Sequence, residues 1–185
     1  MTHTLPGTTI AVDWDHPEEA ETLLNSLFLA GGLMLSQLAS LTGLEPHVIQ
    51  NWVRRGFVAP PVRKRYSRRQ FSRIVLINML KDSMQLDKIC TLLCYVNGEL
   101  DDESDDLIDD SQLYLYIVRL AALAEHQSPA GPNEAARWCQ TAVSDYSEPV
   151  PGARDRVARC LQVILTAYLS ARLKREAEAM LAQLA

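Results

Sequence analysis

The sequence predicts a nearly all-α protein with a small β-wing and a helical C-terminal region. Two observations lead to this fold class. Apolar residues recur at helical spacing in most segments, and the helix breakers Gly and Pro fall between those segments. The exception is the segment 57–66, where Pro60 and Pro61 exclude a helix and demand a turn, so we expect a hairpin there.

Composition limits the class of protein. The chain has 185 residues, of which 48% are hydrophobic, enough for a core of one domain or of a small domain with a helical extension. No apolar run approaches the roughly 20 residues that span a bilayer, so we expect no membrane partner. The first residues do not resemble a secretory signal. The four cysteines form no CxxC pair, so we expect reduced thiols and a cytoplasmic location.

The N-terminal part, residues 1–34, is predicted to be a tail followed by one helix. Residues 1–16 show no periodicity and are expected to be loose. Pro17 is suited to open a helix with acidic residues in its first turn, and Gly31-Gly32 is suited to end it.

The next part, residues 35–97, is predicted to be a module of short helices and a hairpin. Ser36 is expected to cap a helix that ends at Gly43, and Pro46 to open a second one that stops at Gly56. After the hairpin, Ser67 is expected to cap a helix to about Lys81. A further helix is expected over 86–96.

The last two parts differ sharply in charge. Residues 98–110 carry eight carboxylates and no basic residue, and we expect an acidic loop. Residues 111–185 are predicted to form helices at about 111–126, 133–146 and 153–184, separated by loops rich in Pro and Gly.

Basic residues are concentrated in the predicted module. The protein has a net charge of −5, yet nine of its 18 Lys and Arg residues fall between Glu45 and Asp82, where no acidic residue occurs. Such clustering indicates a polyanionic partner, foremost DNA.

The predicted helix 46–55 has two faces. Val48, Ile49, Trp52 and Val53 share one side and are expected to pack on the preceding helix. The opposite side carries amide, imidazole and guanidinium groups, which hydrogen-bond to base edges and phosphates in a major groove. An ordinary amphipathic helix with a solvated face has the same pattern, and the neighbouring basic hairpin favours the DNA interpretation.

Two resemblances extend this interpretation. LSQLASLTGLEPHVIQNWVRRGFVAPP and the following RRQFSRIVLINML resemble the winged helix-turn-helix of the MerR group of transcription regulators, over roughly residues 35–96. That resemblance implies a second helix in the major groove and a wing on the DNA backbone. Where those regulators have an Arg-Tyr-Tyr-Glu-like run, this chain has Gln50-Asn51-Trp52-Val53.

The second resemblance is closer. NWVRRGFV, KRYSRRQFSRIVLINMLKDS and NGELDDESDDLIDDSQLY are similar to the bacterial family called domain of unknown function 1836, over about residues 35–120. The family implies no established biochemistry.

We therefore expect a DNA-binding protein, a bacterial transcription regulator that reads double-stranded DNA as a homodimer. Operators are usually read by symmetric pairs, and the long C-terminal helix offers a seam for self-association or for packing on its neighbours. The alternative is a protein-interaction module on a winged-helix scaffold that binds an acidic partner. The expected DNA contacts are His47, Gln50, Asn51, Arg54, Arg55, Arg63, Lys64, Arg65, Arg68 and Arg69.

Other patterns in the sequence have simpler interpretations beside the chemical ones. No catalytic or phosphate-binding motif occurs, so neither an enzyme nor a cofactor is expected, and the sequence identifies no effector. Cys90 and Cys94 are spaced to share a helix face, as a metal-binding or redox pair or as small apolar fillers. The acidic loop lacks an EF-hand pattern; it is expected to be solvated and to cap the next helix, or to mimic phosphates and cover the wing.

Overall fold

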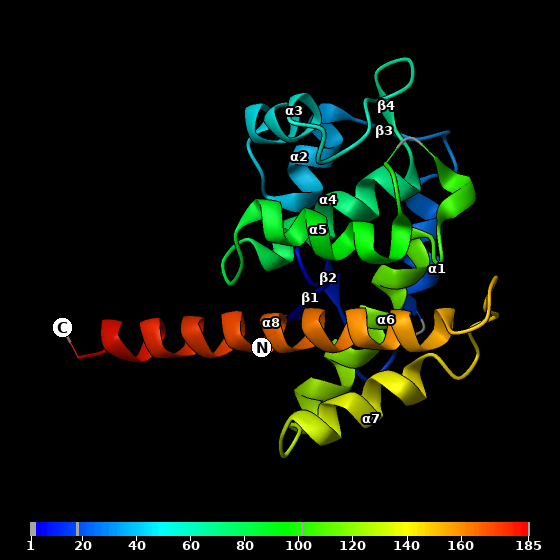
Figure 1. Ribbon diagram of the computed structural model, residues 1–185. Helices are drawn as coiled ribbons and strands as arrows, with labels where there is room; N and C mark the ends of the chain where they lie inside the picture. Colours follow the sequence, from blue (N-terminus) through cyan, green and yellow to red (C-terminus); the bar gives the residue numbers. More distant parts are fainter. Residues whose placement is uncertain (1–2, 18, 101, 185) are drawn as a thin grey trace.

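The computed structural model describes residues 3–17, 19–100 and 102–184, and its helices surround one central helix (Figure 1). The elements follow in the order β1 (His3–Thr4), β2 (Ala11–Val12), α1 (Glu19–Leu27), β3 (Leu33–Met34), α2 (Leu35–Thr42), α3 (Pro46–Arg54), β4 (Arg65–Tyr66), α4 (Arg68–Leu80), α5 (Leu86–Asn97), a 3-10 turn (Glu103–Asp105), α6 (Asp110–His126), α7 (Pro132–Ala142) and α8 (Ala153–Ala182). The prediction of a mostly helical chain with a small β-element is confirmed.

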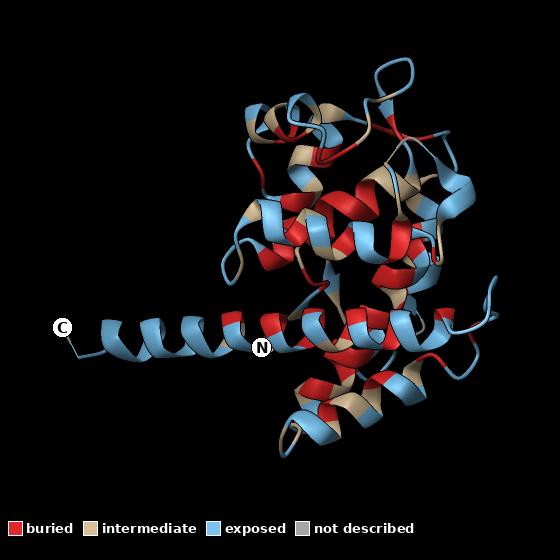
Figure 2. Cartoon of the chain, in the orientation of Figure 1, coloured by how far each residue is buried: buried red, intermediate tan, exposed pale blue. Residues whose placement is uncertain are grey.

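The central helix is α4, which is buried on nearly all sides (Figure 2). Phe71 to Ile77 are all buried because α2, α5, α6 and α8 pack around it. Ser67 caps it as predicted: the Ser67 hydroxyl accepts a hydrogen bond from the Gln70 amide (3.2 Å), and the Gln70 side chain accepts one from the Ser67 amide (2.7 Å).

The expectation of a loose N-terminal tail is wrong for the described residues 3–16. His3 and Thr4 pair antiparallel with Val12 and Ala11, and Leu5 between the strands is fully buried. The Pro6 carbonyl accepts a hydrogen bond from the Tyr114 hydroxyl in α6 (2.8 Å). This segment is ordered by contacts with helices far away in sequence, which is why local periodicity gave no sign of it.

Helices α2 and α3 follow the predicted pattern closely. Helix α2 begins at Leu35, one residue before the predicted Ser36 cap, and the amide of Met34 donates to the Gln37 side chain (2.8 Å). Pro46 opens α3 as expected. The apolar face is also confirmed, because Ile49 and Trp52 are buried and Val48 and Val53 are partly buried against the core.

The predicted wing is a short hairpin that contains β4. Val62 and Arg65 exchange two backbone hydrogen bonds around the turn Arg63-Lys64. Strand β4 pairs antiparallel with β3, with Leu33 opposite Tyr66 and Met34 opposite Arg65. We call residues 62–66 the basic hairpin. Its strand partner lies just ahead of α2, so hairpin and helices form one unit.

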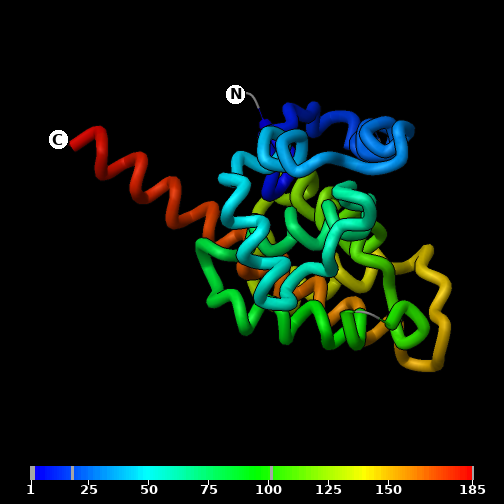
Figure 3. The backbone as a smooth tube through the Cα atoms, turned by 90° about the horizontal axis from the view of Figure 1, so that it is seen from above, coloured from blue at the N-terminus to red at the C-terminus, as the bar shows by residue number. Residues whose placement is uncertain are grey.

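The C-terminal helices complete the core. Helices α6 and α8 pack on α4, and α7 packs on α8. Helix α8 is buried only along its first part, since every described residue from Leu173 onward is exposed. Figures 1 and 3 show this end of α8 extending away from the body of the molecule. In the described part of the chain, no helix combines the length and apolar character needed to cross a bilayer.

Replacing Trp52 by Ala tests how α3 is held. Trp52 is 2% exposed, so we expect Trp52→Ala to lower the free energy of unfolding by about 3–5 kcal/mol, measured by urea denaturation. The control is Leu29→Ala, because Leu29 is 86% exposed and its truncation should change stability by less than about 0.5 kcal/mol. Similar destabilisation of both variants would contradict the packing described for α3.

Candidate nucleic-acid interface

Helix α3 presents its polar face to solvent. His47, Gln50 and Arg54 are exposed, and Asn51 is half-buried beside them. Ile49 and Trp52 on the opposite face are buried in the core, so the backbone that carries these polar groups is held in place. Imidazole, amide and guanidinium groups on one exposed helix face can donate to and accept from base edges.

Two interactions order the end of this face. The Asn51 amide oxygen accepts a hydrogen bond from the Arg54 guanidinium (3.0 Å), so these side chains are aligned with each other. The Arg55 guanidinium lies over the Phe57 ring, 4.3 Å from its centroid, and 3.3 Å from Asp87 of α5. Arg55 and Asp87 are both exposed, so this ion pair is weak and exchanges readily with other anions.

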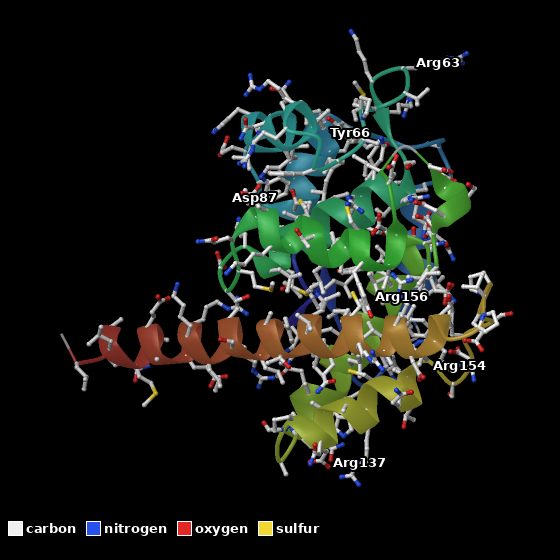
Figure 4. All side chains as sticks on the ribbon, viewed as in Figure 1. Arg63, Tyr66, Asp87, Arg137, Arg154 and Arg156 are labelled. Atoms are coloured by element: carbon white, nitrogen blue, oxygen red, sulfur yellow. The ribbon has the colours of Figure 1, made fainter. Side chains whose placement is uncertain are left out.

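The turn of the basic hairpin holds two cations in an uncommon backbone conformation. Arg63 and Lys64 have φ angles of 48° and 63°, in the left-handed region where Asn or Gly is usual. Both side chains are exposed. Figure 4 shows Arg63 at the tip of the hairpin, at the same end of the molecule as α3. The hairpin turn therefore holds two cations in backbone conformations that are strained for residues with side chains.

Arg65 and Arg68 have contacts inside the protein. The Arg65 guanidinium donates to the Gly32 carbonyl (2.9 Å), and the Arg68 guanidinium donates to the Asn25 side chain of α1. Their donors therefore help fix the hairpin and α4 to the N-terminal segment. Arg65 is exposed and Arg68 is half-buried, so they contribute charge more than free hydrogen-bonding groups.

Arg69 is surrounded by carboxylates of the acidic segment, which we define as residues 98–110. Its guanidinium lies 3.2 Å from Glu103, 2.6 Å from Asp106 and 3.9 Å from Asp110. The Arg69 side chain is 17% exposed. Because its guanidinium is already neutralised and largely covered, Arg69 lies outside the free part of the interface.

Arg73 and Asp110 form a buried ion pair beside Arg69. The two residues are 4% and 1% exposed, and their charged groups lie 3.3 Å apart. Arg73 also donates to the Phe57 carbonyl (2.8 Å). Burial raises the pKa of the Asp110 carboxyl against the opposing effect of Arg73 and Arg69. Burial likewise raises the pKa of Asp106 to about 6, although Arg69 opposes the shift.

The acidic segment is folded onto the module and is only partly solvated. The Asp109 carboxylate caps α6 by accepting from the Ser111 amide (2.7 Å), as the predicted helix cap requires. The Leu107 amide donates to the Val96 carbonyl (2.8 Å), which returns the chain to α5. Gly98, with φ of 56°, has no room for a side chain because Asp105 lies against it.

The described carboxylates of this segment leave the exposed surface of the basic hairpin uncovered. They contact Arg69 and Arg73, behind the hairpin, and none of them pairs with Arg63 or Lys64. A cavity of about 780 Å³ separates the two, lined by the hairpin on one side and by Glu103 and Asp110 on the other. The face of α3 and the hairpin tip therefore remain accessible to a polyanion.

The cysteine pair shows no sign of a metal site. Cys90 and Cys94 are both free thiols, and among the described residues no group of three or more His, Cys, Asp or Glu side chains is arranged to hold a metal ion. Burial raises the pKa of Cys90 to about 11, which favours an inert thiol. Its surroundings agree with the interpretation of Cys90 as an apolar filler.

Comparison with known proteins gives a family match for the part of the chain that forms this surface. Residues 31–117 match the family described as Domain of unknown function (DUF1836). The matched stretch contains α3, the basic hairpin, the acidic segment and Asp110, while α7 and α8 lie outside it. The resemblance to this family is thus confirmed over that stretch. No curated protein and no solved structure matches the chain.

The structure brings together residues that the sequence does not link. By sequence, Arg73 is one cation of the basic module and Asp110 is the end of the acidic loop, yet they meet in the core. One signal of this is present: Arg73 stands between Phe71 and Ile74 in an otherwise apolar run. A charge in such a position needs a buried partner.

Substitution at the buried pair tests its structural role. Arg73→Met leaves Asp110 with weaker compensation, and we expect it to lower the free energy of unfolding by about 3–5 kcal/mol. The double variant Arg73→Met/Asp110→Leu should recover much of that stability, because two apolar side chains need no partner. Urea denaturation of Arg73→Met, Asp110→Leu and the double variant gives the coupling energy of the pair.

The control for this cycle is the exposed pair Arg119–Asp145, whose charged groups also lie 3.2 Å apart. Arg119→Met should cost less than about 1 kcal/mol. Equal destabilisation by Arg73→Met and Arg119→Met would show that the buried pair contributes no more to stability than the exposed pair.

Proposed function

We propose that the protein binds double-stranded DNA, with α3 in the major groove and the basic hairpin on the phosphate backbone, as a transcription regulator of the MerR-like winged helix-turn-helix type. One observation carries this proposal. Figure 4 shows Arg63, at the hairpin tip, at the same end of the molecule as the exposed polar face of α3, and none of the described carboxylates of the acidic segment pairs with Arg63 or Lys64.

The order of elements supports the proposed type. Helices α2 and α3 are joined by a short turn at Gly43, where φ is 69°, and the hairpin and α4 follow directly. In a helix-turn-helix the second helix enters the major groove and its first residues reach base edges. Here those positions carry His47, Gln50 and Asn51, and amides suit adenine because they can donate and accept at once.

We propose a smaller set of DNA-contacting residues than the sequence alone predicts. Gln50, Asn51 and His47 are assigned to base edges, and Arg54, Arg55, Arg63 and Lys64 to phosphates. Arg65 supplies charge from the hairpin. Arg68 and Arg69 are left out of direct contact because Asn25 and the acidic segment hold their guanidinium groups.

A second function has a specific observation in its favour. Glu103 and Asp106 already bind Arg69, so this module holds an acidic peptide within its own chain. An acidic protein partner could use the exposed cations in the same way. The two functions predict different specificity. Affinity depends on base sequence if the protein reads DNA, and only on charge density if it binds an acidic protein.

The first test is the salt dependence of DNA binding. About four phosphate contacts per protomer should give a slope of log Kobs against log salt of roughly −4. Arg63→Ala/Lys64→Ala should reduce the slope by about 2. The control Arg137→Ala/Arg159→Ala removes the same charge from α7 and α8 and should leave it unchanged. Absence of binding to any genomic fragment at ~50 mM salt would reject the proposal.

The second test separates base reading from backbone contact. Gln50→Ala and Asn51→Ala should reduce the preference for the selected sequence, by about 1–3 kcal/mol for each bidentate pair of hydrogen bonds to a base that the substitution removes. Gln50→Ala is the cleaner variant because Asn51 also aligns Arg54. Arg63→Ala should instead weaken binding to all sequences alike. If both kinds of variant behave identically in competition binding, α3 does not lie in the groove as proposed.

A further inference from the structure

The exposed C-terminal part of α8 carries a stripe of apolar side chains on the helix face opposite to the one that packs on the core. We call residues 173–184 the tail. In the first part of α8, Val157, Ile164 and Tyr168 face the core. Leu173 follows Ile164 by nine residues, about two and a half turns, so it points to the opposite side of the helix. Met180 lies on this opposite side, Leu181 lies beside it, and Leu184 follows two residues after α8 ends at Ala182.

The stripe is fully open to solvent along the tail. Leu173, Met180, Leu181 and Leu184 are 65%, 67%, 67% and 84% exposed. Three of these large apolar side chains project from the exposed part of α8 and the fourth lies just beyond its end, and so much exposed apolar surface in one place marks an interaction site. Because the core-facing side of α8 is a separate face, no rearrangement of the body is needed to reach the stripe.

The same stripe continues from the tail onto the body. Val163, which is 43% exposed, Thr166 and Ser170 lie on the solvent side of α8, in line with the apolar residues of the tail. Beside them the turn between α4 and α5 contributes Met84, and together these residues line a shallow, largely apolar groove. The molecule thus has an apolar ridge and an apolar groove on one helix face.

The order of charged residues along the tail determines whether two such helices pair better in parallel or antiparallel. Arg172, Lys174 and Arg175 come first, and Glu176 and Glu178 follow. Two tails in the same direction would align like charges. Two tails in opposite directions place the basic stretch of one against the acidic stretch of the other, which electrostatic complementarity favours.

From these observations we propose that α8 pairs antiparallel with α8 of a second copy, about a two-fold axis near Arg175. In this register Leu173 meets Ala177 of the second copy, Ser170 meets Met180, and Thr166 meets Leu184. The ridge of each tail then lies in the groove of the other copy beside Met84. About fifteen helical residues of each copy overlap, over roughly 22 Å. An isologous pair of this kind closes on itself.

The pairing extends the expectation of a homodimer to a defined surface and register. It does not depend on DNA binding, because α3 and the basic hairpin take no part in it. In the proposed function it would supply the symmetric pair of reading helices.

Sedimentation of the full-length chain tests the surface. The wild-type protein should sediment at micromolar concentration with about twice the chain mass of 20.7 kDa. Met180→Glu and Leu173→Glu should each shift it to the monomer mass, with unchanged circular dichroism. The matched control is Ala182→Glu, on the opposite side of the same tail, which should remain dimeric. A monomeric wild type, or a dimeric Met180→Glu, overturns the proposal.

Cross-linking tests the direction and register. In a Cys94→Ser background, a mixture of Thr166→Cys and Leu184→Cys proteins should be joined by a short thiol-specific reagent. Neither protein alone should be joined, because identical positions would lie about 27 Å apart in the antiparallel pair. Efficient cross-linking within the Thr166→Cys protein alone and within the Leu184→Cys protein alone would show a parallel pair and overturn the register.

Discussion

The buried ion pair between Arg73 and Asp110 is the interaction on which the arrangement of this protein depends. A buried charge is tolerated only when a partner and further hydrogen bonds compensate it. Arg73 therefore fixes three separate segments at once: its own helix α4, the start of α6 through Asp110, and the chain after α3 through the Phe57 carbonyl.

The basic residues of the module fall into two groups, according to whether they face the acidic segment or solvent. Arg69 and Arg73 face the acidic segment and hold it against α4, whereas Arg54, Arg63 and Lys64 point outward. The described carboxylates of the acidic segment pair with the inner cations and not with Arg63 or Lys64. The net effect is a basic surface at one end of an acidic protein, where the two strained residues of the hairpin turn keep their charges in solvent.

Helix α8 shows how one element can serve two surfaces. Its first part stabilises the core through residues on one side, and its last part carries apolar residues on the other side. Averaged over its whole length, such a helix has no single apolar face. Its sequence is therefore compatible both with self-association and with packing on the neighbouring helices. The structure shows that both faces exist, one after the other, and only the first is covered within the described chain.

The sequence by itself determined the local elements. Pro46 and Ser67 predicted the starts of α3 and α4, although α1 spans only Glu19–Leu27 and α7 ends at Ala142, four residues before its predicted end. The spacing of Ile49 and Trp52 predicted which face of α3 is buried. These features rest on interactions between residues a few positions apart, which a sequence displays directly. The tertiary structure alone decided that residues 3–16 pack as a hairpin, that Arg73 finds Asp110, and that Arg69 is withdrawn from the surface. Each of these depends on partners tens of residues away, and no local pattern says which distant charge or carbonyl a side chain will meet.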